Sequence, residues 1–214
     1  MKKISIPKLP IETNDIEEID RVLATLPAHN IDEVNWADQY PSKPNVSFRI
    51  AHNSTHILLQ YQVHENELLA LVDEDNGKVW TDSCVEFFVT FNNTHYYNIE
   101  ASCIGKTLMG HRLIGDKASH ASAPILKSIA RLSSLGTNTI AKQAGNFSWT
   151  LTLVIPCSAY WGDKISKLDG VTARANFYKC GDNLTTPHFV SWNSIETPKP
   201  SFHQPAFFGE IEFE

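Results

Sequence analysis

"CVEFFVTFNNTHYYNIEASCIG" (residues 84–105) is the stretch that decides the fold. Two segments rich in aromatic and β-branched residues flank the polar sequence NNTH, which is typical of a β-hairpin. If Asn93 and Thr94 form the turn, Cys84 faces Cys103 on the neighbouring strand. We expect free thiols there, and a disulfide between these two cysteines is the alternative.

Glu86 interrupts the first strand of this hairpin, which is otherwise apolar. With the same turn, Glu86 and Phe88 share one face, whereas Asn98 and Glu100 lie on the other. This register does not bring Glu86 and Glu100 together, although a β-bulge would change it. A glutamate at this position belongs either to a packed interior or to one wall of a binding site.

The rest of the chain also has the character of β-strands. Ile57, Leu59, Tyr61 and Val63 alternate with more polar residues, which is the period of a half-buried strand. Further strands are predicted at residues 45–52, 125–135, 147–156, 171–180, 188–193 and 208–214. Long helical patterns between strands are missing. The predicted fold is therefore all-β: an antiparallel two-sheet β-sandwich of the jelly-roll or immunoglobulin-like kind, with little helix.

The chain reads as one domain at residues 31–214 with an N-terminal extension at residues 1–30. Ile16, Ile19 and Leu23 have helical spacing, so the extension contains either a short helix or a strap packed on the domain or leading into it.

A proline-rich segment lies near the C-terminus, at residues 193–207. Pro198, Pro200 and Pro205 exclude a central strand, and phenylalanines give the segment apolar anchors. We expect an ordered loop, and a loop of this length in a compact domain is often functional.

The composition is that of an ordinary globular protein, with 214 residues and a net charge of -6. This charge argues against a nucleic-acid partner and against attraction to an anionic membrane. The N-terminus lacks the apolar core of a signal peptide, which predicts a cytoplasmic protein, or a periplasmic or secreted one if a leader has been removed. A monomer is favoured.

Metal binding and catalysis have weak signals in the sequence. The four cysteines (Cys84, Cys103, Cys157 and Cys180) contain no C-x-x-C pair, so their spacing does not indicate a zinc site. Asp73 and Asp75 in DEDNG are candidate ligands of a structural calcium ion, and no other cofactor is expected. No spacing singles out the two carboxylates that a glycosidase needs, so we expect no enzyme.

Two tryptophans stand at positions where an aromatic face can be open to solvent. Trp80 follows a polar loop, and Trp192 ends a strand and opens the proline-rich loop. The axial C–H bonds of a pyranose form an apolar patch that stacks on an indole, while its hydroxyls need polar partners at the ring edge. Trp80, Trp192 and Glu86 are therefore candidate residues of a saccharide site.

These segments together resemble the family-nine carbohydrate-binding modules and their DOMON-like sandwich relatives. The resemblance is carried by VWTDSCVEFFVTF followed by YYNIEASCIGKTL, and by HFVSWNSIETPKPSFHQPAFFGEIEF near the C-terminus. It spans residues 34–213. It implies a jelly-roll-like sandwich that binds the terminal sugar of a glucan- or xylan-type saccharide. It also implies a role in polysaccharide catabolism, since such modules usually accompany glycoside hydrolases.

The resemblance also implies roles for single residues. Trp80 and Trp192 would sandwich the sugar, and Glu86 would bind its hydroxyls. The other polar residues near the two motifs are Asn98, Glu100, Asn193, His203 and Gln204. Family members place an arginine on the strand after the hairpin; YYNIEASC offers Asn98 and Glu100 but no arginine, and Arg112 and Arg174 are the substitutes.

Other functions fit the same sandwich. One is a haem-binding electron-transfer domain, for which Met109 and His111 are the available ligands. They share one strand face, so they cannot ligate opposite sides of one haem. A second is an accessory module of a glycoside hydrolase that has lost sugar binding.

Overall fold

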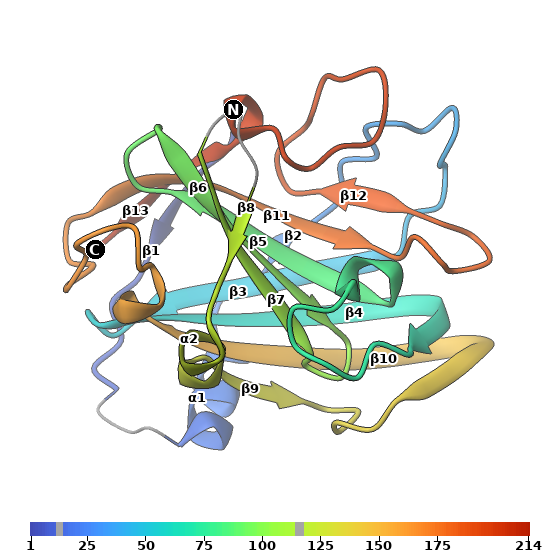
Figure 1. The fold of residues 1–214 in the computed structure, drawn as a ribbon, viewed down its shortest axis with the longest axis horizontal. Coiled ribbons are helices and arrows are strands. Elements are labelled where there is room, and N and C mark those ends of the chain that lie inside the picture. The colour runs from blue at the N-terminus through green and yellow to red at the C-terminus, as the bar shows by residue number, and fades with distance from the viewer. Residues whose placement is uncertain (12–14, 114–117) are drawn as a thin grey trace.

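The computed structural model describes residues 1–11, 15–113 and 118–214. Two β-sheets pack against each other, and Figure 1 shows β5, β6 and β7 in front of the long strands β3, β4 and β10. The larger sheet contains, in spatial order, β1 (Lys3–Ile6), β13 (Gly209–Phe213), β11 (Thr172–Cys180), β5 (Cys84–Thr90), β6 (His95–Ser102), β7 (Thr107–Leu113) and β8 (Ala118–His120), with β12 (Phe189–Ser191) also paired to β11. The smaller sheet contains β2 (His29–Asn30), β3 (Asn45–His52), β4 (His56–Ala70), β10 (Ile140–Pro156) and β9 (Ala130–Ser133). The predicted all-β sandwich is confirmed.

The main core lies between the two sheets. Phe177 of β11 stacks on Phe48 of β3 with ring centroids 3.7 Å apart, and on Phe87 of β5 at 5.0 Å. Odd-numbered residues of β5, β6 and β11 point into this core. Because side chains alternate along a strand, the even-numbered residues of these strands point to the outer face of the larger sheet.

The hairpin of β5 and β6 has a register that differs by one residue from the sequence prediction. Glu86 pairs with Glu100, and Cys84 pairs with Ser102 rather than with Cys103. The cause is the turn: Asn93 has a φ of 60°, which belongs to a left-handed loop with Asn93 at its centre. A shift of one residue moves every side chain of β6 to the other face. Glu86 and Glu100 therefore lie on the same face.

The four cysteines are free in the structure, so the alternative of a disulfide between Cys84 and Cys103 is wrong. The residue that faces Cys84 on its other side is Cys180 of β11.

Two predicted boundaries differ from the structure. Residues 125–135, predicted as one strand, form the end of a short helix, α2 (Ala123–Ser128), and then β9. Pro124 is favourable in the first turn of this helix, where its missing N–H has no partner to lose. β10 begins at Ile140, ahead of the strand predicted at residues 147–156, and its register shifts twice before Phe147.

The N-terminal residues pack on the sandwich in two pieces. β1 adds to the edge of the larger sheet by pairing in parallel with β13. The helix α1 (Ile16–Leu23) begins after Asp15, whose side chain accepts a hydrogen bond from the backbone N–H of Glu17, and it buries Ile19 and Leu23. The short helix predicted from the spacing is confirmed.

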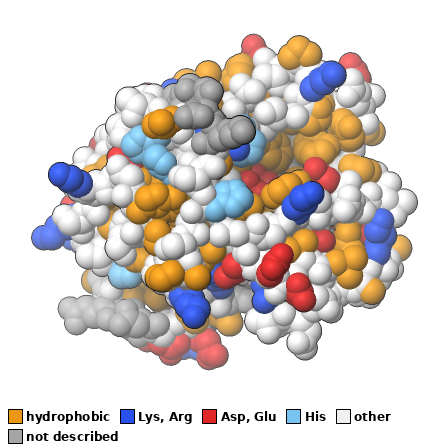
Figure 2. All heavy atoms as spheres, viewed as in Figure 1, with side chains coloured by type: hydrophobic (Ala, Val, Ile, Leu, Met, Phe, Trp, Pro, Cys, Tyr) orange, Lys and Arg blue, Asp and Glu red, His pale blue; other side chains and the backbone are white. Residues whose placement is uncertain are grey.

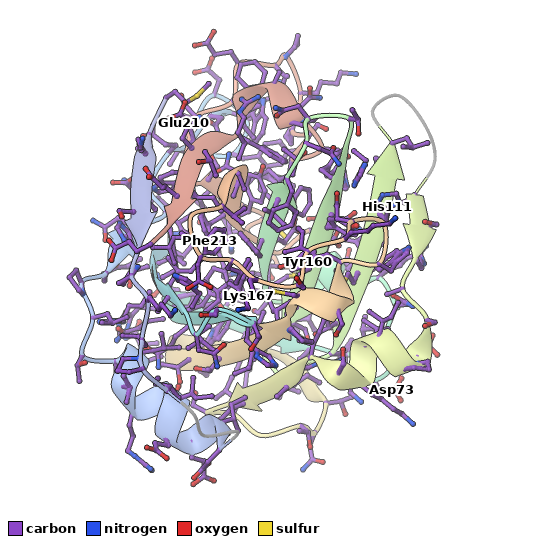
Figure 3. The ribbon with its side chains drawn as sticks, turned by 90° about the vertical axis from the view of Figure 1, so that its left-hand side faces the viewer. Asp73, His111, Tyr160, Lys167, Glu210 and Phe213 are labelled. Atoms are coloured by element: carbon purple, nitrogen blue, oxygen red, sulfur yellow. The ribbon has the colours of Figure 1, made fainter. Side chains whose placement is uncertain are left out.

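Three 3₁₀ helices complete the secondary structure of the described residues: η1 (Val79–Thr81), η2 (Cys157–Ala159) and η3 (Pro205–Phe207). The segment after η2 carries Tyr160 and Lys167, and in Figure 3 it lies between β7, which carries His111, and β13, which carries Phe213. Tyr160 is buried against the main core, so this segment covers one end of it. No helix among the described residues has the length and apolar character needed to cross a membrane.

Candidate functional site

A pocket of about 400 Å³ opens on the outer face of the larger sheet. Its floor consists of even-numbered residues of β5, β6, β7 and β11, and its walls come from η1, β8 and the loops after β11 and β12. It is lined by Trp80, Glu86, Asn98, Glu100, Leu108, Arg112, Ala118, His120, Cys180, Asp182, Phe189, Pro200, Ser201, Phe202 and His203. Figure 2 shows this face, with acidic side chains recessed between histidine and hydrophobic side chains.

The proline-rich loop forms one wall of the pocket and is held by aromatic residues. Trp36 donates from Nε1 to the carbonyl of Thr197 at 2.8 Å, and Tyr178 donates from its hydroxyl to the carbonyl of Phe202 at 3.2 Å. The rings of Tyr178 and Phe202 also stack, with centroids 4.1 Å apart. The loop is therefore ordered, as predicted, and it presents His203 to the pocket.

The floor of the pocket is a set of buried hydrogen-bonding groups. Asn98 donates from Nδ2 to Oε1 of Glu100 at 2.9 Å, and Glu86 lies opposite Glu100 on β5. The buried Oδ1 of Asn98 has no hydrogen-bond partner within the described parts of the chain. A Cβ atom at position 110 would lie 2.5 Å from this oxygen, so Gly110 leaves room for the amide. The floor thus offers an unsatisfied acceptor, which in a folded protein calls for a partner.

The carboxyl groups of the pocket have unusual acidities. Burial raises the pKa of Glu86 well above its ordinary value, and the neighbouring Cys180 and Glu100 raise it further. Burial also raises the pKa of Glu100 to about 7, against the lowering effect of its hydrogen bond from Asn98. Burial raises the pKa of Asp182 to about 6. The pocket therefore holds protons near neutral pH and carries less negative charge than three carboxylates would give it.

Arg112 supplies the positive charge of the pocket. It lies on β7 opposite Tyr96, and its charge acts on Glu100 and on His203 across the pocket. Arg174 does not take this place, because its guanidinium donates to the carbonyls of Ala206 and Phe208. Of the two substitutes named from the sequence, Arg112 is the one in the site.

Trp80 and Trp192 do not form the predicted sugar site between two indole rings. Trp80 lies on η1, is half-buried and lines the pocket. Trp192 is 3% exposed and lies in the core between the sheets, with ring centroids 5.7 Å from Phe177 and 6.3 Å from Phe48. Its indole lies over Gly209, because a Cβ atom at position 209 would lie only 2.4 Å from Cζ3 of the indole.

The prediction that Trp192 is exposed is wrong, and strand alternation gives the reason. The backbone N–H of Trp192 donates to the carbonyl of Phe177, so Trp192 continues the pairing of β12 with β11. Phe177 points into the main core, and a side chain directly opposite it on an adjacent strand points the same way. The other aromatic side chains of the pocket are instead Phe189 and Phe202.

Two further predicted residues lie outside the pocket lining. The side chain of Asn193 accepts from the backbone N–H of Lys2 and donates to the carbonyl of Phe207, each at 2.8 Å, so it ties the N-terminus to the proline-rich loop. Gln204 makes a long contact of 3.4 Å with Ser201. The structure thus brings together five predicted residues: Trp80, Glu86, Asn98, Glu100 and His203.

Several pocket residues were missed by sequence reasoning. Asp182, His120, Cys180, Phe189 and Phe202 reach the pocket from strands and loops far apart in the chain. Among these residues, only Cys180 could have been suggested by the sequence, because it occupies an even-numbered, outward-facing position of β11. That inference would also have required knowing that β11 pairs with β5.

The other expected ligand groups have structural partners. Asp75 forms an ion pair with Arg131 at 2.6 Å and accepts from the backbone N–H of Thr107 at 3.0 Å. Calcium binding by Asp73 and Asp75 stays a prediction. Met109 is fully buried between the sheets, where its sulfur cannot reach a haem without opening the core.

Comparison with known proteins identifies the family and the fold of this chain. The model of carbohydrate-binding family 9 matches residues 17–213. A structure of a proposed carbohydrate-binding protein from Bacteroides uniformis ATCC 8492 is 42% identical, with a TM-score of 0.96, covering 100% of this chain and 99% of the other. No match was found among curated proteins.

Two structures of a family 9 carbohydrate-binding module from Caldicellulosiruptor kristjanssonii share the fold. The complex with glucose is 13% identical with a TM-score of 0.57, and the complex with cellotriose is 12% identical with a TM-score of 0.56. They cover 100% of this chain and 96% and 94% of the module, respectively. The family match extends over nearly the whole sandwich, including both segments that build the pocket. This chain belongs to carbohydrate-binding family 9.

Proposed function

We propose that the pocket on the outer face of the larger sheet binds a terminal, uncharged pyranose of a glucan- or xylan-type saccharide, without catalysis. One observation carries this proposal: half-buried Trp80 stands beside a recessed floor of Glu86, Asn98 and Glu100 in a pocket of about 400 Å³. An apolar ring face next to convergent hydrogen-bonding groups is what a sugar requires.

Each part of the pocket has a role in this proposal. The indole of Trp80 covers the apolar face of the pyranose, and Phe189 and Phe202 supply further aromatic surface. Carboxyl oxygens of Glu86 and Glu100 and the free Oδ1 of Asn98 accept from sugar hydroxyls, while Arg112 donates. This replaces the tryptophan pair expected from the family by one tryptophan and two phenylalanines.

The charges of the pocket favour a neutral sugar over an acidic one. Three carboxyl groups (Glu86, Glu100 and Asp182) line it with one arginine. A uronic acid would place its own carboxylate among them, which is electrostatically unfavourable in a partly buried site. The relatives solved with glucose and cellotriose make these the first ligands to test, with xylose and glucuronate as comparisons. We propose with it a role beside glycoside hydrolases in polysaccharide breakdown.

Hydrolysis is not expected from this geometry. A glycosidase holds its scissile bond between two carboxyl groups. Glu86 and Glu100 instead lie side by side on neighbouring strands of the pocket floor. We expect aryl-glycosides to remain intact in the presence of the protein.

Replacing Trp80 with alanine is expected to weaken binding of glucose and cellotriose by at least about 10-fold, because the stacking surface is lost. The measurement is isothermal titration calorimetry on the purified chain, with the fold verified by circular dichroism. Trp161→Ala is the matched control, since Trp161 is 36% exposed and lies outside the pocket lining. Equal affinities for the Trp80 variant and the wild type would refute the role of Trp80. If the wild-type chain binds no neutral sugar in this measurement, the proposed function is refuted.

Affinity for glucose is expected to rise about fivefold between about pH 5 and about pH 8, because a charged acceptor makes a stronger hydrogen bond than a neutral one. Glu100 is the group responsible, since burial raises its pKa to about 7. Glu100→Gln should flatten this pH profile.

The stability of the free protein gives an independent readout of the same group. A carboxyl group whose pKa is raised on folding contributes stability that is present below its unfolded pKa of about 4.3 and is lost as the pH rises through the folded value. The wild type should therefore lose stability between about pH 5 and about pH 7, with a smaller slope in Glu100→Gln. Identical slopes in both proteins would show that Glu100 titrates normally.

A further inference from the structure

Two thiols and a carboxyl group meet at one end of the pocket floor. Cys84 of β5 and Cys180 of β11 face each other across the sheet, and Glu86 follows Cys84 on the same face. The thiol of Cys180 donates to Oε1 of Glu86 at 3.1 Å. In the part of the chain that the structure describes, Cys84, Glu86 and Cys180 are the one group of His, Cys, Asp and Glu side chains whose ligand atoms all lie within 4.8 Å of one another.

We propose that Cys84, Cys180 and Glu86 bind a thiophilic divalent cation such as Zn²⁺. Cysteine thiolates and glutamate carboxylates are each ligands that Zn²⁺ accepts, and thiolates select soft or borderline metals over Ca²⁺ and Mg²⁺, which prefer oxygen. Three protein ligands leave the fourth position of a tetrahedral site for water or a further group.

The pocket gives the cation a route and a favourable field. Cys180 and Glu86 both line the pocket, so a cation that enters through its mouth meets these two ligands first, and Cys84 lies buried behind them. Asp182 lies in the same lining, close enough for its charge to act on both Cys180 and Glu86. Additional negative charge beside the site stabilises a bound cation.

Simple packing of the two thiols explains the arrangement less well. Buried free cysteines usually act as small apolar groups. The third member is a carboxyl group, 3% exposed, whose one hydrogen bond in this cluster comes from the weak thiol donor of Cys180, and burying a carboxyl group with so little compensation is costly. Cys103 and Cys157 are also buried, and they take part in no comparable group among the described residues.

The cation and the saccharide would compete for Glu86. This consequence alone rests on the proposed function, because the metal site itself is defined by protein atoms. If both proposals hold, saturating Zn²⁺ will lower the affinity for glucose.

The test is titration of the fully reduced chain with Cd²⁺, whose bonds to thiolates give an ultraviolet charge-transfer band, followed by displacement with Zn²⁺. We expect one equivalent to bind, and the band to disappear in Cys84→Ser and in Cys180→Ser. Glu86→Gln should keep the band and weaken binding by at least about 10-fold, since even outer-sphere groups contribute that much. Cys103→Ser is the matched control and should behave as the wild type.

Three results would overturn the metal site: no band with the wild type, a band that survives in a folded Cys84→Ser or Cys180→Ser, or loss of the band in a folded Cys103→Ser. Should a serine variant not fold, Glu86→Gln decides by itself, because unchanged Cd²⁺ affinity in that variant contradicts the site. The titration contains no sugar, so its failure leaves glucose binding standing, and a protein that binds Cd²⁺ but no sugar refutes only the proposed function.

Discussion

Trp192→Ala is expected to lower the free energy of unfolding by about 3–5 kcal/mol, the usual cost of removing a large aromatic side chain from a core. The indole packs edge-on against Phe48 and Phe177, one from each sheet. Gly209 beneath it has no side chain that could fill the cavity. The variant should therefore lose contacts between the two sheets at a position that cannot collapse.

Urea unfolding followed by circular dichroism measures this effect, with Trp161→Ala as the control. Because Trp161 is 36% exposed and packs on Tyr97 and His111 at the edge of the structure, its replacement should cost clearly less than that of Trp192. Sugar affinity of the Trp192 variant should change little under conditions where it remains folded. If the Trp192→Ala variant is as stable as the wild type but has lost sugar binding, the structure is contradicted. The predicted sugar site between two tryptophans would then be supported.

Lys179→Met is expected to destabilise the protein by about 3–5 kcal/mol, because it leaves the buried carboxylate of Glu65 without its counter-charge. Lys179 of the larger sheet and Glu65 of the smaller sheet form an ion pair at 2.9 Å, and both side chains are almost fully buried. The ammonium group also contacts Nε2 of His188 at 2.9 Å. Burial and the Lys179 charge lower the pKa of His188 to about 2, so its imidazole stays neutral and accepts this hydrogen bond.

The double variant Lys179→Met, Glu65→Gln separates the unpaired charge from the lost packing. A glutamine at position 65 keeps an acceptor for Nε1 of Trp149, which now donates to Glu65 at 2.7 Å. The double variant should recover part of the stability that Lys179→Met loses, and thermal and urea unfolding measure this recovery. Lys3→Met is the control, since Lys3 pairs with Glu212 at the exposed surface and should contribute less than about 1 kcal/mol. Equal effects of the Lys3 and Lys179 single variants would show that the buried pair is unimportant.

The fold could be predicted because alternation along the strands is a local property. Ile57, Leu59, Tyr61 and Val63 all lie in the main core, on the shared face that the sequence indicates. The spacing that defines helix α1 is equally local. The helix α2 and the early start of β10 were not predicted, since both depend on packing against distant segments rather than on the residues themselves.

The site was only half predictable for the same reason. Trp80 and Glu86 stand in one continuous motif, so their shared place in the pocket follows from short-range structure. Glu86 and Glu100 face each other because one turn residue, Asn93, adopts a left-handed conformation. Asparagine permits this conformation but does not require it.

The orientation of Trp192 and the meeting of Cys84 with Cys180 depended on the partners of β11. Strand pairing between segments so far apart in the chain leaves no periodic signal in the sequence. A tryptophan at a strand end can point to either side, and only the register with Phe177 settles its direction.

The parallel pairing of β1 with β13 also bears on biosynthesis. Residues 3–6 leave the ribosome long before their hydrogen-bonding partners at residues 209–213. During translation Ile4 and Ile6 therefore remain without their native neighbours while the rest of the sandwich can already form. The nascent domain carries an unpaired, partly apolar edge for most of its synthesis, and this edge is where chaperone protection would matter most.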